Sequence, residues 1–278
     1  MEKCLTIDDP PLGIGLALLS ALLGAFGFNA LKLAHHDTPY AGVTGAFFLV
    51  AAFILYYTAL TYAGELIITP VLCAVIPINY VTALIINNES GAKLVTVQIV
   101  IGCLLMIAGW LPMKCINTDT LHWPRAVIFA AILSCIMLFF AINIVYIISS
   151  QSSQMTLLLF SEAFLTGAMQ SLSGVMARVI KEKASMMPLI AIIIVFTIGQ
   201  FIIINMAMKQ FNVINFVPIY IGTWIICDVL SGGLIFLEFA VFDMTHLLIY
   251  VFGMVITLVA MVFVARDHKY ELLESQEI

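Results

Sequence analysis

The chain has 278 residues, of which 63% are apolar and only 10% are Asp, Glu, Lys or Arg. Soluble domains contain about 45–50% apolar and about 25% charged residues, so this composition excludes a large water-soluble domain, a disulfide scaffold, a disordered regulator and a nucleic-acid binder. The net charge of −5 is too small for this length to indicate a charged partner.

Long apolar runs, separated by short polar or proline-containing breaks, follow one another along nearly the whole chain. A helix that crosses a bilayer needs about 20 apolar residues, and open sheets do not survive in hydrocarbon. The pattern predicts an all-α polytopic membrane protein of about nine transmembrane helices in contact with the lipid bilayer. The predicted helices are residues 12–33, 41–62, 66–86, 93–111, 125–149, 155–178, 187–208, 213–237 and 246–265.

The short segments between these helices carry little further information. The N-terminal sequence lacks the basic region and the cleavage site of a signal peptide, so helix 12–33 is predicted to remain as the first span. Six of the 11 Lys and Arg residues fall on one side of a nine-helix arrangement and five on the other; the positive-inside rule therefore gives no orientation. The six cysteines are predicted to be packing residues, because no Cys/His spacing suits zinc.

An internal repeat relates the two halves of the chain. Residues 53–71 align with residues 201–219 at an offset of 148, and each segment contains the end of one helix, a short polar turn and a helix with an early proline. The shift carries the second helix onto the seventh, an odd displacement that inverts one half. The landmarks that match in order are Phe53 and Phe201, Ala59 and Ala207, Pro70 and Pro218, Glu89 and Glu238, and Gly102 and Gly253.

This order of landmarks predicts two inverted repeats, as in many secondary transporters, with a site between them near the membrane midplane. Residues 12–149 form the first repeat together with a linking helix, five helices in all. Residues 155–265 form the second repeat of four helices, and residues 266–278 form a C-terminal tail.

Several segments resemble one known family. They are Tyr56–Pro70 (YYTALTYAGELIITP), residues 87–90 (NNES), residues 101–110 (IGCLLMIAGW), Ile204–Tyr220 and Leu237–Phe239. These segments resemble the NIPA-type magnesium transporters, a nine-helix branch of the drug/metabolite transporter superfamily related to the EamA proteins. The resemblance implies the drug/metabolite transporter fold and a carrier for Mg2+ and other divalent cations, with Mg2+ as substrate and no resident cofactor. The family has a glutamate in the second span where this chain has Phe53.

Two carboxylates, Glu162 and Asp228, lie inside the predicted helices. Ionisable residues within membrane helices are costly and usually functional, and carboxylate oxygens suit a hard cation such as Mg2+. Both acids are therefore predicted metal ligands. Each belongs to a polar stripe at helical spacing that is predicted to line the substrate path: Thr166, Gln170 and Ser173 with Glu162, and Tyr220, Trp224 and Ser231 with Asp228.

The two acids are predicted to be separate stations on one path. At 1.5 Å per residue, Glu162 and Asp228 differ in depth by ~12 Å, far more than a Mg–O distance of ~2.1 Å. Gln170 lies at the depth of Asp228 and is its predicted partner. Pro70 and Pro218 interrupt the backbone hydrogen-bond ladder, and the carbonyls that they free are predicted to line the path.

Other polar residues are predicted to have ordinary roles. Glu65, Glu89 and Glu238 lie near helix ends, where a solvated carboxylate is normal. Residues 35–37 (HHD) are interpreted as a solvated turn, because adjacent side chains seldom point at one ion. Residues 270–273 (YELL) resemble a tyrosine-based sorting signal, which favours the plasma membrane or an endosomal membrane.

The prediction is a transporter, not an enzyme, that works by alternating access. Within transport, the alternative is an EamA-type carrier of a small organic metabolite held by Tyr220, Trp224 and Asp228. A membrane-embedded lipid enzyme needs a nucleophile–base pair or a metal cluster, and a non-transporting scaffold leaves the buried acids unexplained. The sequence leaves open the exact substrate, the membrane orientation and the coupling ion. It also leaves open the oligomeric state, including whether the protein is a homodimer.

Overall fold

The structure is a computed structural model that describes residues 10–35, 38–89, 93–110, 123–150, 154–182 and 187–274. Within these ranges the chain is almost entirely helical and contains no strand. The elements are α1 (Pro10–Ala34), α2 (Pro39–Tyr62), α3 (Glu65–Leu72), α4 (Val75–Ile86), α5 (Lys93–Trp110), α6 (Trp123–Ser150), α7 (Met155–Glu182), α8 (Met187–Gln210), α9 (Val213–Leu234), η1 (Glu238–Val241) and α10 (Met244–Glu274).

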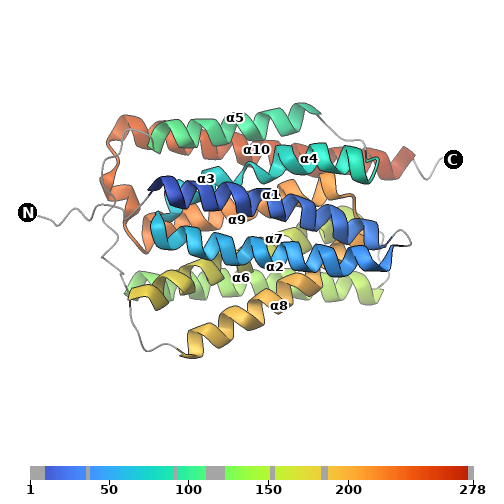
Figure 1. Cartoon of the computed structure of the whole chain (residues 1–278), viewed down its shortest axis with the longest axis horizontal. Helices are drawn as coiled ribbons and strands as arrows, with labels where there is room; N and C mark the ends of the chain where they lie inside the picture. Colours follow the sequence, from blue (N-terminus) through green and yellow to red (C-terminus); the bar gives the residue numbers. More distant parts are fainter. Residues whose placement is uncertain are drawn as a thin grey trace, which may run out of the picture.

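The helices run back and forth along one common direction (Figure 1). α3 and α4 follow each other in a single traverse, so the described helices succeed one another in the order that the sequence predicts. Seven described segments are long and apolar enough to cross a bilayer, and two shorter apolar stretches, Val97–Gly109 and Met244–Ala260, lie in α5 and α10. α10 continues to Glu274 and includes most of the predicted tail. The apolar run ends near residue 265, but the polar residues that follow still form a helix.

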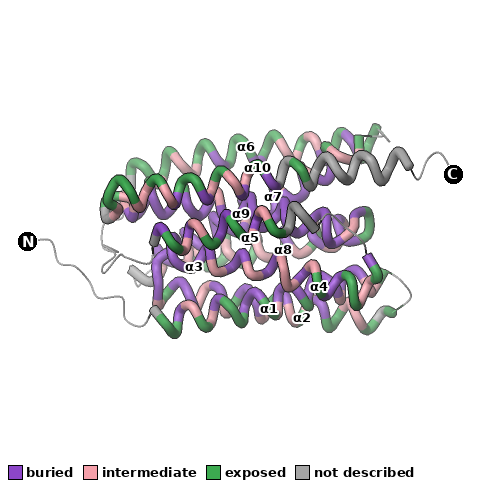
Figure 2. The backbone as a smooth tube through the Cα atoms, turned by 90° about the horizontal axis from the view of Figure 1, so that it is seen from above, coloured by how far each residue is buried: buried purple, intermediate pink, exposed green. Residues whose placement is uncertain are grey.

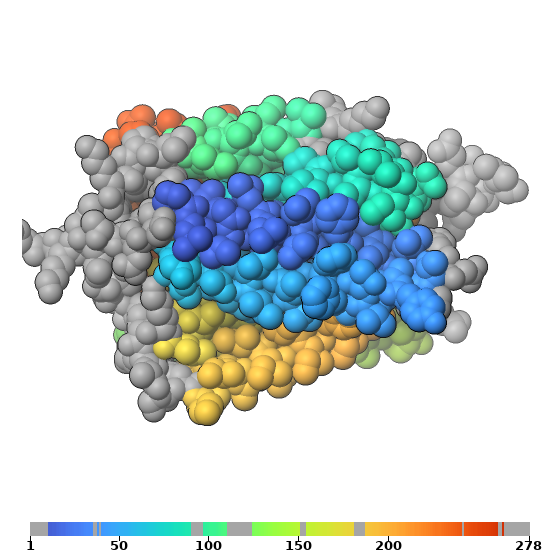
Figure 3. Space-filling model, in the orientation of Figure 1, coloured from blue at the N-terminus to red at the C-terminus, as the bar shows by residue number. Residues whose placement is uncertain are grey.

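The arrangement places α9 at the centre of the bundle. In the most apolar 18-residue stretch of α9, 89% of the residues are buried, whereas the corresponding stretches of α6 and α8 are 17% and 11% buried. Figure 2 shows buried segments inside the bundle and exposed segments along its outer helices. Figure 3 shows one outer face, to which α5, α4, α1, α2 and α8 contribute. The exposed side chains of α6 and α8 are mainly apolar, which fits contact with lipid.

Two prolines have different effects on their helices. Pro70 lies near the end of α3, whose C-cap is Cys73, and the chain then starts again as α4. Because Pro70 has no N–H, the Leu66 carbonyl loses its partner in the helix; the Tyr250 hydroxyl donates to it at 3.4 Å. Pro218 lies inside α9, which continues without interruption.

α5 and α10 cross closely where two glycines meet. A Cβ atom on Gly102 would lie 2.7 Å from the Gly253 carbonyl oxygen, and a Cβ atom on Gly253 would lie 2.5 Å from that of Gly102. Small residues allow helix backbones in a membrane to approach closely. This crossing joins the two halves of the chain.

Candidate functional site

Asp228 is fully buried in α9 and is held by side chains from two other helices. Its Oδ2 accepts hydrogen bonds from the Tyr56 hydroxyl of α2 at 2.7 Å and from the Thr69 hydroxyl of α3 at 3.2 Å. Its Oδ1 completes no hydrogen bond with a described residue, although the Ser171 hydroxyl interacts with the carboxyl group. The carboxyl group therefore keeps one oxygen available for a ligand.

Aromatic rings line one side of this carboxyl group. Trp224 lies one turn before Asp228 and packs edge-on against Tyr56, with ring centroids 4.6 Å apart. Its indole N–H donates to the Tyr56 hydroxyl at 3.4 Å. Tyr220, another turn earlier, lies 5.9 Å from Trp224 between ring centroids and stacks on Phe216. The site thus combines a carboxylate with three neighbouring aromatic faces.

A second buried carboxylate, Glu65, interacts electrostatically with Asp228. The Ser231 hydroxyl, which lies one turn after Asp228 in α9, donates to Glu65 Oε2 at 2.7 Å. Arg178 of α7 donates to Glu238 Oε1 at 2.6 Å and lies 3.7 Å from Glu65 Oε1. All of these side chains are buried.

This cluster contains more acidic than basic groups. Its three carboxyl groups, those of Asp228, Glu65 and Glu238, interact electrostatically with Arg178 or with one another. One guanidinium does not balance three carboxylates, and an uncompensated charge is expensive in a membrane interior. A bound cation or bound protons must therefore compensate the excess negative charge of these carboxyl groups.

Glu89 makes a related arrangement at the opposite end of α9. Its two carboxylate oxygens accept the backbone N–H groups of Val213 and Ile214, each at 3.1 Å. Lys32 of α1 interacts electrostatically with Glu89, and its Nζ donates to the Phe211 carbonyl at 2.8 Å. The first turn of α9 is thereby closed by a carboxylate from the first half of the chain.

The prediction of solvated carboxylates at helix ends is wrong. The exposed fractions of Glu65, Glu89 and Glu238 are 0%, 8% and 1%. Each residue does lie at a helix end, but the first turn of another helix or a buried arginine packs over it. That neighbour comes from the other half of the chain, so local sequence gave no signal of it.

Glu162 is buried in α7 and is separate from Asp228. Neither of its carboxylate oxygens has a hydrogen-bond partner among the described residues. Its backbone carbonyl accepts the Thr166 hydroxyl at 2.5 Å. No hydrogen bond or ion pair between described residues joins Glu162 to Asp228, and their role as two stations on one path stays a prediction.

The polar stripe of α7 faces inward, but no hydrogen bond between described residues joins it to Asp228. Thr166, Gln170 and Ser173 are fully buried. The Gln170 amide completes no hydrogen bond with a described residue, and its pairing with Asp228 at one ion stays a prediction. Gln170 interacts with the Tyr57 hydroxyl, without the geometry of a hydrogen bond.

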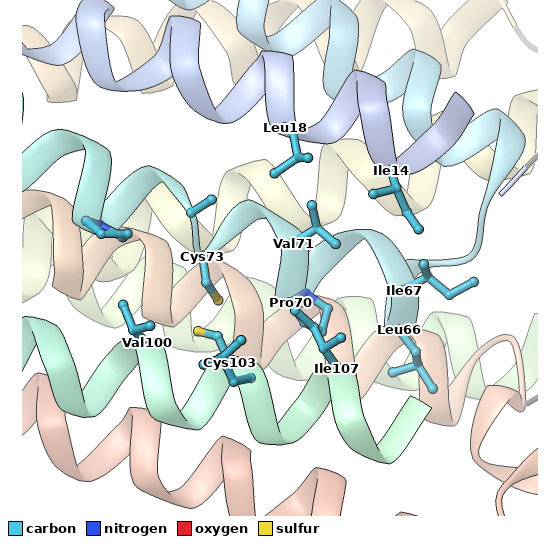
Figure 4. Close-up of a pocket in the computed structure, with 13 residues that line it drawn as sticks. Ile14, Leu18, Leu66, Ile67, Pro70, Val71, Cys73, Val100, Cys103 and Ile107 are labelled. Atoms are coloured by element: carbon cyan, nitrogen blue, oxygen red, sulfur yellow. The ribbon is translucent and has the colours of Figure 1, made fainter. Parts of the chain in front are cut away.

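Pro70 faces a different environment from Asp228. A pocket of about 380 Å³ between α1, α3, α4 and α5 is lined almost entirely by apolar side chains, Pro70 among them. Figure 4 shows the thiols of Cys73 and Cys103 directed towards each other in this pocket. The rim residues Leu18 and Leu104 are exposed on the outer surface. This pocket therefore suits an apolar occupant, whereas the path to be lined by the carbonyls that Pro70 and Pro218 free stays a prediction.

Two further sequence motifs lie partly outside the described residues. In the HHD turn, His35 follows α1, whereas residues 36 and 37 are not described. The backbone of α10 passes through residues 270–273, whose side chains are not described. Within the described ranges, no group of three or more His, Cys, Asp or Glu side chains has the arrangement of a metal site.

Sequence reasoning did not identify five members of the site: Tyr56, Glu65, Thr69, Arg178 and Glu238. Tyr56 and Thr69 each place a single hydroxyl in an apolar run, a signal that is too common to single them out. Glu65, Arg178 and Glu238 lie near predicted helix ends, where charge is ordinary. What distinguishes all of these residues is their packing against distant parts of the chain, which the local sequence does not show.

Comparison with protein-family models, with curated proteins and with solved structures found no match for this chain. Its apolar helices and their lipid-compatible outer surface define a multi-pass integral membrane protein.

Proposed function

We propose that this protein is a carrier for Mg2+ and other divalent cations, and that it works by alternating access through a site between two inverted repeats of the drug/metabolite transporter type. The observation that carries the proposal is the excess of buried carboxyl groups around Asp228 and Glu65. An interior of this kind attracts a cation for reasons of charge alone.

The donor atoms around this cluster favour a hard cation. Asp228 Oδ1 and Glu65 Oε1 accept no hydrogen bond from a described residue, and the Ser231 and Thr69 hydroxyls lie against the same two carboxyl groups. Mg2+ is bound by oxygen atoms, usually through one or two carboxylates with several retained waters. Asp228 and Glu65 would bind the ion, and Ser231 would orient Glu65.

The helix boundaries support the repeat. α2 and α8 have 24 residues each, and their first residues, Pro39 and Met187, are 148 positions apart. The traverse Glu65–Ile86 and helix α9 have 22 residues each, again at an offset of 148. In this alignment α6 is the linking helix between α1–α5 and α7–α10.

The same alignment shows that several polar residues of the site each occur in only one of the two halves. Four polar residues of the site align with residues of a different kind in the other half: Tyr56 with Ile204, Glu65 with Val213, Asp228 with Tyr80, and Ser231 with Ala83. The repeated fold does not require these polar side chains. A role in binding substrate accounts for them.

The alternative is an EamA-type carrier of a small organic cation. The observation in its favour is the aromatic lining, since Tyr56, Tyr220 and Trp224 lie beside Asp228. Aromatic faces attract organic cations through cation–π interactions. Such a substrate would use the same carboxylate but would gain less from Glu65 and Ser231.

Flux measurements in proteoliposomes test the proposal. An internal magnesium indicator would report Mg2+ uptake by the parent protein, by Asp228→Asn and by Glu65→Gln. Both substitutions should lower uptake by at least about tenfold, a loss found even for residues that only orient a metal ligand. Asp243→Asn is the matched control, because Asp243 is an exposed carboxylate; its uptake should equal that of the parent.

Three results would contradict parts of the proposal. Parent uptake at the level of empty liposomes contradicts magnesium transport. Normal uptake by Asp228→Asn contradicts the site. Uptake of a small quaternary ammonium ion that depends on Asp228, without Mg2+ uptake, favours the organic-cation carrier.

A further inference from the structure

Glu89 and Glu238 bind helix ends in a reciprocal manner. Glu89, from the first half, accepts the first N–H groups of α9 in the second half. Glu238, from the second half, accepts the Leu66 N–H in the first turn of α3 at 3.0 Å. Leu66 and Ile214, which donate to the two glutamates, are 148 positions apart. Each half of the chain therefore caps a helix of the other half.

The backbone before each glutamate has the same unusual conformation. Asn88 has φ 53° and Leu237 has φ 54°, and they are the only described non-glycine residues with positive φ. Each directly precedes its glutamate, and the two are 149 positions apart. Positive φ is unfavourable for leucine, so the surrounding contacts must hold Leu237 in place.

A basic residue from the first helix of each half accompanies each glutamate. Lys32 of α1 interacts with Glu89, and Arg178 of α7 donates to Glu238. A carboxylate at a helix N-terminus is stabilised by the free N–H groups and by the helix dipole. Each assembly thus combines a carboxylate, a base and a helix N-terminus from both halves, and the two assemblies lie at opposite ends of α9.

We propose that these two assemblies are the closures of the transport path, one at each end, and that Glu89 and Glu238 are positioning residues that hold the ends shut. The inference rests on the proposed alternating-access function and specifies its moving parts. Both closures are formed in this structure, so Asp228 and Glu65 are enclosed. Release of one glutamate from its helix end would open one side while the other stays closed.

The test uses two matched cysteine reporters. Cys227 is buried in α9, seven residues from the end of that helix, and Asn79 is the residue 148 positions earlier, seven residues from the end of α4. At 1.5 Å per residue each lies roughly 10 Å inside its own closure. One protein would keep only Cys227, and the other would carry Asn79→Cys with all native cysteines replaced. A charged, water-soluble methanethiosulfonate would label each purified protein.

Removal of one closure should expose one reporter. Glu238→Ala should increase the labelling rate of Cys227 about tenfold, since a hydrogen bond to a charged group contributes about 1.5–3 kcal/mol, and it should leave the reporter at position 79 unchanged. Glu89→Ala should do the reverse. Glu89→Gln and Glu238→Gln retain one acceptor oxygen and should give smaller increases at the same reporters. Asp243→Asn, which removes an exposed helix-capping carboxylate, should change neither rate.

The outcomes distinguish this inference from the proposed function. Equal exposure of both reporters by either glutamate variant, or no exposure by any variant, would overturn the closures even if Mg2+ flux is normal. Selective exposure in a protein without Mg2+ flux would retain the closures and reject magnesium as the substrate.

Discussion

At the scale of single residues, Asp228 is defined by what its two oxygens contact. Oδ2 accepts the Tyr56 and Thr69 hydroxyls, whereas Oδ1 completes no hydrogen bond with a described residue. Hydroxyl donors hold a carboxylate in one orientation without neutralising it. The position of this carboxyl group is therefore determined by α2 and α3, while Oδ1 makes no hydrogen bond that would hold it away from a ligand.

Tyr56→Phe tests this orientation. The substitution removes one donor and keeps the ring that packs on Trp224, so a buried carboxylate oxygen loses a partner at a cost of about 1–3 kcal/mol. We expect a lower unfolding temperature in detergent and weaker cation binding. Tyr57→Phe is the matched control, because the Tyr57 hydroxyl completes no hydrogen bond with a described residue; a loss as large as that of Tyr56→Phe would contradict this explanation.

Arg178 is predicted to be the most sensitive charged residue of the cluster. It pairs with Glu238 at 2.6 Å and lies near Glu65, so Arg178→Met leaves buried carboxylates without a counter-charge. Loss of one partner of a buried ion pair costs about 3–5 kcal/mol. Thermal unfolding should show that the double variant Arg178→Met/Glu238→Met is more stable than Arg178→Met alone. A double variant less stable than Arg178→Met would show that the unpaired Glu238 carboxylate is not the cause of the lost stability.

At the scale of helices, the molecule uses two kinds of contact between its halves. α3 and α4 form a broken traverse against α9, where polar side chains meet, and α5 and α10 cross through glycines. The broken traverse has an interruption at Cys73 that permits bending. The glycine crossing leaves no space for adjustment, so it is the fixed contact about which the halves are joined.

Gly102→Ala should destabilise this crossing. The added Cβ would lie 2.7 Å from the Gly253 carbonyl oxygen, and overpacking of this kind costs about 1–3 kcal/mol. Gly15→Ala is the matched control, because no atom lies within 4 Å of its added Cβ and alanine favours the helix by up to about 1 kcal/mol. Fluorescence-detected size-exclusion after heating compares the two; equal stability would contradict a tight crossing.

At the scale of the whole molecule, α1 begins at one end of the bundle and α10 ends at the other (Figure 1). The sequence predicts nine crossings, an odd number, and such a chain would have its two termini on opposite sides of the membrane. The balanced distribution of Lys and Arg does not tell which terminus is cytoplasmic. The relation between the termini is nevertheless testable without that knowledge.

Epitope tags at the two termini should therefore differ in accessibility. In intact cells an antibody should reach one tag, and only permeabilisation should expose the other. A tag on an exposed loop of a soluble cytoplasmic protein serves as the permeabilisation control. Simultaneous access to both tags in intact cells would show an even number of crossings and would contradict the nine-helix prediction.

The sequence by itself determined the class of the protein, the order of its helices and the presence of the carboxylate Asp228 inside a helix. These properties depend on composition and on the length of apolar runs, which are local and need no knowledge of neighbours. Glu162 is also buried as predicted, since a lone carboxylate among apolar residues is already unusual in one dimension.

Only the tertiary structure decided which groups surround Asp228 and what the glutamates at helix ends do. Tyr56 and Asp228 are 172 positions apart, and Glu89 and Val213 are 124 apart. Helical periodicity shows which face a side chain occupies, but not which distant helix packs on that face. For this reason the sequence did not indicate Tyr56 and Thr69 as donors to Asp228, and it led to the interpretation of three buried glutamates as solvated.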